Sequence, residues 1–187
     1  MQIIMTPKEV DLLSSFLSKT KHYFEFGMGG TTLLASSLVA QSVTSIESDK
    51  EWVEKVRSEI GDPKIKITLR HIYVGPTGGW GTPVDRSHEH LFPTYSNAIV
   101  EADTEKIDFC LVDGRFRVAC FMTALLWLRQ DAIIAIHDYT VRPHYHLVEE
   151  FARNVATCNT LALFVRRSDA DTERMQAVIE NYVRNHE

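Results

Sequence analysis

The sequence predicts an α/β protein, with a doubly wound, mostly parallel sheet and helices on both faces, in a single domain over residues 1–187. Three observations lead to this prediction. Short apolar runs alternate with segments of helical periodicity, which is typical of βαβ units. The run at 107–112 is almost continuously apolar, as in a strand covered on both faces. Acidic residues directly follow several runs, at the strand ends where such sheets bind ligands.

The first half of the chain carries clear element signals. Thr6, Pro7 and Glu9 read as an N-cap, a first-turn proline and a capping-box acid, so a helix is expected in the N-terminal segment 1–20. Ser48 and Glu51 are expected to cap a later helix in the same way. We expect strands at 22–26, 43–47 and 64–74, and helices at 30–41 and 49–60.

The second half continues the alternation. We expect strands at 107–112, 132–136 and 161–165, and helices at 118–128, 144–155 and 171–184. Only one clear strand, at 161–165, precedes the last helix, so the sheet is expected to end without a closing hairpin.

Residues 75–94 interrupt the alternation of strands and helices with a long loop. This loop carries Trp80, His88, His90 and Phe92. Loops of this length inside a compact domain are usually functional lids or disordered segments. The aromatic content is too high for a plain linker. We therefore expect a lid over a ligand, with Trp80 among the residues that bind it.

Composition limits the class of protein. A net charge of −5 without a clustered basic face argues against a nucleic-acid partner. Three cysteines without C-x-x-C spacing indicate reduced thiols in a cytoplasmic protein. The start of the chain does not read as a signal peptide, and no apolar run approaches the ~18 residues of a membrane helix. We expect a cytoplasmic protein without a membrane partner; a homodimer remains open.

The stretch around 23–32 is the most informative. Glu25 lies near the end of a short apolar strand, and Gly27, Gly29 and Gly30 follow before a helix begins. Glycines permit a tight turn and close approach of a ligand to the backbone. A dinucleotide-binding loop would need a third glycine where Thr32 stands, and a Walker loop would need a lysine.

The remaining pattern, E-x-G-x-G-G, resembles the first motif of class I S-adenosylmethionine (SAM)-dependent methyltransferases. The resemblance implies a Rossmann-like methyltransferase fold, in which this loop packs against the amino-acid half of SAM.

A second acid stands at a matching distance. Glu47 ends the β-branched run 43–47, twenty positions after Gly27. In βαβ nucleotide-binding units an acid ~20 residues after the glycines accepts hydrogen bonds from the ribose hydroxyls. We expect Glu47 to bind the ribose diol; the alternative is that it merely precedes the next helix.

Further polar residues follow the later strands. Asp113 comes after 107–112, and His137 and Asp138 come after 132–136. Because ligands bind outside the carboxyl ends of the strands, Glu25, Glu47 and these three residues are expected to face one crevice.

Asp113-Gly114 with His137-Asp138 resembles the fourth motif and following strand of class I O-methyltransferases. In several metal-dependent members an acid after the fourth strand and an Asp-Asn pair after the fifth hold a divalent ion. This chain has His-Asp instead, so a metal is left open.

The chemistry implied by the resemblance is modest. A sulfonium methyl needs mainly alignment, whereas a hydroxyl acceptor also needs a base. His137 is the candidate base, oriented by Asp138, and Asp113 completes the catalytic set; the alternative is that His137 caps a backbone group. Arg115 and Arg117 either bind an acidic substrate or neutralise nearby carboxylates.

Together these features predict a transferase that moves a methyl group from SAM to a small hydroxylated or carbohydrate-like acceptor. The residues expected to bind SAM are Glu25, Gly27, Gly29, Gly30, Glu47, Trp80 and Asp113. Three alternatives remain. One is an NAD-dependent oxidoreductase, and another is a non-catalytic SAM-fold binding module. The third is a nucleic-acid methyltransferase, which the net charge disfavours.

Overall fold

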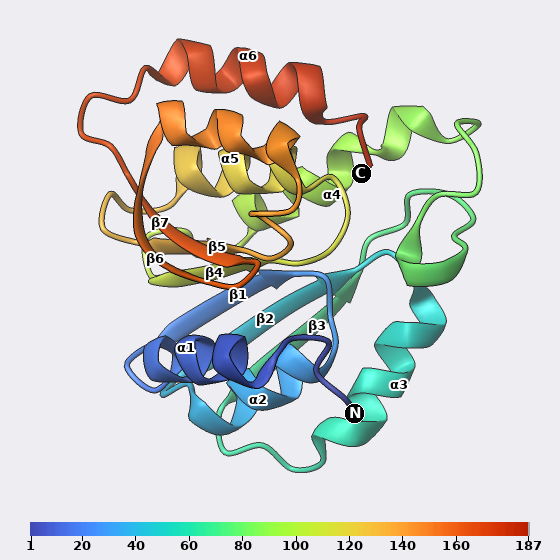
Figure 1. Ribbon diagram of the computed structural model, residues 1–187. Helices are drawn as coiled ribbons and strands as arrows, with labels where there is room; N and C mark the ends of the chain where they lie inside the picture. The colour runs from blue at the N-terminus through green and yellow to red at the C-terminus, as the bar shows by residue number, and fades with distance from the viewer. Residues whose placement is uncertain (187) are drawn as a thin grey trace.

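Seven strands form one sheet in the order β3-β2-β1-β4-β5-β7-β6 (Figure 1). The computed structural model describes residues 1–186 of the chain. Strands β1 to β5 are parallel, and β7 is antiparallel to both β5 and β6. The strands are β1 (His22–Phe26), β2 (Ser42–Glu47), β3 (Lys66–His71), β4 (Phe109–Val112), β5 (Ile133–Ile136), β6 (Ala152–Cys158) and β7 (Leu161–Arg166).

Helices cover both faces of the sheet, with α1, α2 and α3 on one side and α4, α5 and α6 on the other (Figure 1). The α-helices are α1 (Pro7–Leu17), α2 (Gly30–Leu38), α3 (Lys50–Ile60), α4 (Pro93–Asn97), α5 (Arg117–Trp127) and α6 (Thr172–Tyr182). The 3-10 helices are η1 (Gly79–Gly81), η2 (Glu89–Leu91), η3 (Ala98–Glu101) and η4 (Pro143–Glu150). The predicted doubly wound α/β fold is confirmed.

Within residues 1–186, none of the helices is long and apolar enough to cross a membrane.

The caps of two helices differ in how well the sequence predicted them. The capping box of α1 is present, because the Thr6 hydroxyl accepts from the Glu9 N–H and the Glu9 carboxylate accepts from the Thr6 N–H. For α3 the predicted cap is wrong. Asp49, rather than Ser48, is the N-cap, and its carboxylate accepts from two N–H groups of the first turn. The Ser48 hydroxyl is engaged elsewhere, as described below.

The helix predicted at 144–155 is wrong. The chain forms η4 there and then the edge strand β6, which pairs with β7 as a closing hairpin. Tyr145, Val148 and Phe151 are all buried. Their spacing of three residues fits the 3-10 helix that the chain adopts as well as it fits one face of an α-helix. Asn159, with φ of +48°, makes the turn into β7.

The segment 75–94 is more structured than a plain loop. Thr77 and Pro83 pair in an antiparallel bridge, and η1 lies between them. The Val84 N–H donates to the Pro76 carbonyl at 3.0 Å. The segment therefore begins as a small hairpin, continues through η2 and ends in the first turn of α4.

Candidate functional site

The carboxyl ends of β1, β4 and β5 lie level at one edge of the sheet, because their last residues pair in the strand register. The next residue of each strand is Gly27, Asp113 or His137. Backbone hydrogen bonds continue the pairing: the Asp113 N–H donates to the Phe26 carbonyl at 2.9 Å, and the His137 N–H donates to the Val112 carbonyl at 3.1 Å. The structure thus brings the first glycine and two catalytic candidates to the same edge.

The glycines of the β1–α2 turn have three different environments. Gly27 has φ of +93°, and a Cβ there would lie 2.5 Å from the Cα of Gly114, so two backbones meet closely. A Cβ on Gly30 would lie 2.8 Å from the carbonyl oxygen of Gln2, so Gly30 lets the N-terminal segment pack. A Cβ on Gly29 would have no neighbour within 4 Å. Gly29 is therefore the glycine that faces open space.

Glu25 does not face the crevice, and this expectation needs correction. Its side chain is fully buried, and its carboxylate accepts hydrogen bonds from the hydroxyls of Tyr23, Thr31, Thr32 and Ser45. Burial raises the pKa of this carboxyl to about 7, although the four hydroxyl donors act against the shift.

Thr32, which stands where a dinucleotide loop has its third glycine, also accepts from the Gly29 N–H at 2.9 Å. Glu25 thus stabilises the glycine turn indirectly, through its hydrogen bond to Thr32. It has no exposed surface with which to bind a ligand.

Glu47 lies at the carboxyl end of β2 with 8% of its surface exposed. Its Oε1 accepts from the N–H groups of Ser48 and Asp49 and from the Ser48 hydroxyl, and its Oε2 accepts from the Met28 N–H at 3.2 Å. Burial raises its pKa, against these hydrogen bonds. The acid therefore joins the β2 tip to the glycine turn, and Oε2 is its less engaged oxygen.

The hairpin of segment 75–94 lies on this acid. The Ser48 hydroxyl shares its single proton between Oε1 of Glu47 at 3.0 Å and the Gly81 carbonyl at 2.9 Å, and a Cβ on Gly81 would lie 2.7 Å from Oε1 of Glu47. Trp80, next to Gly81, is 77% exposed and has φ of +62°. The segment therefore contacts Glu47, and its role as a lid over a ligand stays a prediction. The Trp80 side chain itself is turned outward rather than onto the acid.

Asp113, His137 and Asp138 form one cluster. Nδ1 of His137 lies 3.0 Å from Oδ1 of Asp113 and 3.9 Å from Oδ1 of Asp138. The residue that orients His137 is therefore Asp113, not Asp138 as expected from the sequence. Burial lowers the pKa of His137, but the hydrogen bond and charge of Asp113 and the charge of Asp138 outweigh it, so the pKa is raised above 6.5.

Arg117 ties this cluster together from the first turn of α5. Its guanidinium lies 3.1 Å from Asp113 and 3.1 Å from Asp138, and it donates to the His137 carbonyl at 2.7 Å. It therefore neutralises carboxylates, one of the two roles left open for it. A divalent ion does not fit here, because the cation of Arg117 already occupies the space between the two acids. Within residues 1–186, no group of three or more His, Cys, Asp or Glu is arranged to hold a metal.

Two neighbours of the site were not predicted. Oε1 of Glu9 lies 3.8 Å from Nε2 of His137, on the ring edge opposite Asp113. Hydrogen bonds from Thr160 and Thr6 outweigh burial and lower the pKa of Glu9 to about 2. Trp52 donates from Nε1 to the Met28 carbonyl at 2.7 Å and so braces the glycine turn. In the sequence, the capping box already accounts for Glu9. Its contact with His137 can therefore be found only from the fold.

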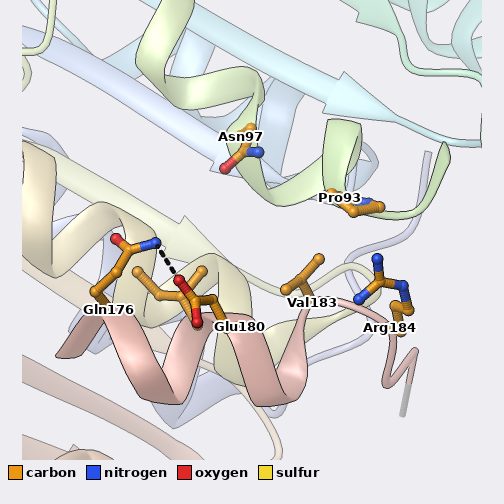
Figure 2. Close-up of a pocket in the computed structure, with 7 residues that line it drawn as sticks. Pro93, Asn97, Gln176, Glu180, Val183 and Arg184 are labelled. Carbon is orange, nitrogen blue, oxygen red and sulfur yellow. Dashed lines mark hydrogen bonds between the residues drawn. The ribbon is translucent and has the colours of Figure 1, made fainter. Parts of the chain in front are cut away.

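A separate cavity of about 230 Å³ opens between α4 and α6 (Figure 2). It is lined by Pro93, Asn97, Gln176, Ile179, Glu180, Val183 and Arg184. None of the residues predicted for the site borders it, so this cavity is not the crevice at the strand tips.

Comparison with solved structures supports the same fold. A methyltransferase-like protein from Silicibacter pomeroyi is 28% identical, with a TM-score of 0.88 over 100% of this chain and 98% of its own. An RNA methyltransferase from Salinibacter ruber, in complex with S-adenosyl-L-homocysteine, is 14% identical, with a TM-score of 0.55 over 90% of this chain and 97% of its own. The N-methyltransferase NodS from Bradyrhizobium japonicum is 13% identical, with a TM-score of 0.52 over 86% and 94%.

No protein-family model matches the chain, and no curated protein sequence does. The two more distant structures show the fold alone, whereas the Silicibacter pomeroyi protein matches along the whole chain. The predicted class I resemblance is confirmed by these matches. The chain therefore has the class I fold of the SAM-dependent methyltransferases and is similar to the Silicibacter pomeroyi methyltransferase-like protein along its whole length.

Proposed function

We propose that the protein binds SAM and transfers its methyl group to a hydroxyl of a small, hydroxylated or carbohydrate-like acceptor. The observation that carries this proposal is the His137–Asp113 pair, which lies directly beside the glycine turn. Nδ1 of His137 is 3.0 Å from Asp113, and Asp113 is followed by Gly114, whose backbone meets Gly27. A base next to a cofactor loop is the arrangement that methylation of a hydroxyl requires.

The residues of the turn fit SAM. Gly29 leaves open space where a side chain would project, which allows a ligand to approach the backbone. Oε2 of Glu47 accepts one hydrogen bond, from Met28, and so retains capacity for a ribose hydroxyl. In this proposal Gly27, Gly29 and Gly30 line the methionine half, Glu47 holds the ribose, and Asp113 lies at the reacting end.

The lid also has a place in this proposal. Gly81 rests on Glu47, so the hairpin has to shift when a diol reaches the carboxylate. Trp80 would then move with its neighbour, from an exposed position to one over the cofactor. Closing an aromatic lid would also keep water from the sulfonium.

The step itself balances without a further reactant. SAM supplies an activated methyl group; the acceptor oxygen forms the O–CH₃ bond as the S–CH₃ bond breaks, leaving S-adenosylhomocysteine (SAH). The acceptor proton passes to His137. If Nδ1–H donates to the Asp113 carboxylate, the lone pair that takes the proton is on Nε2, which lies 3.8 Å from Oε1 of Glu9. The imidazolium that forms is then stabilised by Asp113, Asp138 and Glu9.

RNA is a less suitable acceptor. The likeness to RNA methyltransferases lies at 14% identity and concerns the fold. A net charge of −5 provides little attraction for a phosphate backbone.

A cytoplasmic location is supported by the three free cysteines, two of them buried.

Calorimetry with SAM, SAH and NAD tests the cofactor, and SAH release in the presence of small hydroxylated compounds or RNA tests the acceptor. We expect SAM and SAH to bind and NAD not to bind. Binding of NAD without SAM would identify an oxidoreductase instead. SAM binding without turnover on any acceptor would favour a non-catalytic module, and turnover on RNA alone would contradict the small-molecule acceptor.

A further inference from the structure

Three arginines gather at the carboxyl ends of β4 and β5, and two of them are paired. Arg117 is buried and bridges Asp113 and Asp138 at 3.1 Å each. Arg142, just before η4, lies 3.4 Å from the same Asp138. Arg115 is the third arginine, and the ion pairs to Asp113 and Asp138 engage only the other two.

Arg115 is the unpaired member. It lies in the turn after β4, between Gly114 and the start of α5, and is half-buried. Within residues 1–186 its guanidinium makes no hydrogen bond or ion pair, and its Nε is buried without an acceptor. Burial and the nearby charge of Arg117 lower the pKa of the Arg115 guanidinium. Burying a guanidinium without an anion costs free energy, because its N–H donors lose hydrogen bonds to water and form none within the protein.

Tyr145 is a second unsatisfied group in the same place. Its side chain is fully buried in η4, and its hydroxyl has no hydrogen-bond partner among residues 1–186. The Arg142 guanidinium lies 5.8 Å from the Tyr145 ring centroid. Burial raises the pKa of Tyr145, whereas the positive charges of Arg117, Arg142 and Arg115 act against the shift. The hydroxyl therefore lies in the electrostatic field of all three arginines.

From these observations we propose that Arg115 and Tyr145 bind an anionic group of the acceptor, a carboxylate or a phosphate, next to the His137–Asp113 pair. An oxyanion would supply the acceptor that the buried Nε lacks and the partner that the phenol lacks. The proposal rests on the proposed function and narrows its acceptor to anionic molecules.

The position in the fold favours the acceptor over the cofactor. Tyr145 and Arg142 come from the segment after β5, on the far side of β4 from the glycine turn at β1. His137, the proposed base, lies at the end of β5 on that same side. A charged group held here would anchor an acceptor whose hydroxyl reaches His137.

The test uses the full chain, with inorganic phosphate and acetate as probes, at constant ionic strength and with SAH present or absent. Binding is followed by NMR of the arginine Nε–H groups. We expect the Arg115 signal to shift on addition of the anion. Tyr145→Phe should weaken binding ~10-fold, and Arg115→Gln ~10- to 100-fold. SAH affinity, measured by calorimetry, should stay within about two-fold in both variants. Stronger binding of one probe would show whether the natural group is a phosphate or a carboxylate.

Two matched controls separate binding from folding. Thr123→Val also removes a buried hydroxyl without a partner, but from α5 beside Trp127, and should leave anion binding unchanged. Arg153→Gln removes an exposed arginine from the edge strand β6 and should have equally little effect. Tyr145→Phe keeps the buried ring, so the fold is expected to persist and to gain rather than lose stability.

The proposal is overturned if neither probe shifts the Arg115 signal at concentrations up to tens of millimolar, or if Arg115→Gln behaves like Arg153→Gln. Loss of SAH affinity in Arg115→Gln would overturn it as well, because the anion would then be the cofactor's own carboxylate. Phosphate or acetate binding in a protein that binds neither SAM nor SAH would refute the methyltransferase proposal while supporting the anion site.

Discussion

Gly81 lies directly on the carboxylate of Glu47. A Cβ at position 81 would be 2.7 Å from Oε1 of the acid, and the Gly81 carbonyl accepts a hydrogen bond from Ser48, the residue next to Glu47. Glycine is required here for two reasons, the close approach and a φ of +67°. The lid and the proposed ribose site therefore form one unit, in which movement of the loop changes access to the acid.

Glu47→Ala should weaken SAM binding by ~30- to 1000-fold, because a lost pair of charge-assisted hydrogen bonds corresponds to about 2–4 kcal/mol. Calorimetry at matched folded fraction measures this. Glu47 also holds three backbone N–H groups, so Glu47→Gln, which keeps the side-chain shape, is the better-folded companion. Unchanged SAM affinity in both folded variants would remove Glu47 from the site.

If Trp80 moves with the lid, SAM should change its fluorescence. Trp80 is 77% exposed without ligand, so covering it should shift its emission to shorter wavelength or quench it. Trp52 contacts the glycine turn and could also respond to SAM, so all variants carry Trp52→Phe. In this background the change should disappear in Trp80→Phe and persist in Trp127→Phe, where an exposed tryptophan lies at the end of α5. A SAM-dependent signal that survives Trp80→Phe would show that the lid is not involved.

Valine substitutions at Gly27 and Gly29 should impair different properties, the stability of the fold and SAM binding respectively. Gly27→Val combines a left-handed φ of +93° with a clash against Gly114, and should destabilise the fold by at least about 2 kcal/mol. Gly29 has extended backbone and no neighbour within 4 Å of a Cβ, so Gly29→Val should fold normally but block SAM. Denaturant unfolding and calorimetry separate the two effects. A folded Gly29→Val variant with normal SAM affinity would make this turn purely structural.

Much of this architecture could be predicted because its signals are local. The glycine turn, the acid at the β2 tip and the polar residues after β4 and β5 each follow a short apolar run. The capping box of α1 was read equally well from four residues. The doubly wound sheet follows from the alternation of these runs with helices.

The errors come from patterns that two structures share and from contacts between distant parts of the chain. Tyr145, Val148 and Phe151 repeat every three residues, which fits η4 as well as the predicted α-helix. The glycine motif suggested that the Glu25 carboxylate binds a ligand. In the structure, four hydroxyl groups from three segments enclose this carboxylate. Glu9 meets His137 only because α1 packs beside the β5 end, and no spacing in the sequence reveals that contact.

The buried Glu25 should make stability depend on pH. Its pKa is raised from 4.5 to about 7 by burial, so between these values the folded protein binds more protons at this site than the unfolded chain. The free energy of unfolding should therefore fall as pH rises through this window, by up to about 3 kcal/mol from this group. Glu25→Gln lacks the titration, so the wild-type stability relative to this variant should decrease from pH 5 to pH 8. A pH-independent difference in denaturant unfolding would contradict this prediction.

The last prediction concerns His137 as the base. Only the neutral imidazole accepts a proton, and Asp113 and Asp138 raise its pKa above 6.5 despite burial. Methyl transfer should therefore increase with pH through a single ionisation whose midpoint lies above that of an exposed histidine. Asp113→Asn removes the hydrogen-bonded charge and should move the midpoint to lower pH while slowing turnover.

His137→Ala should lower turnover ~100-fold or more, because general base catalysis contributes about 10²- to 10⁴-fold. SAM affinity should barely change, since the base contacts the acceptor and not the cofactor. Thr123→Val, remote from the acids, should leave the pH profile as in the wild type. A flat pH profile with normal turnover in His137→Ala would contradict the base, and loss of activity on addition of a chelator would show that a metal does its work.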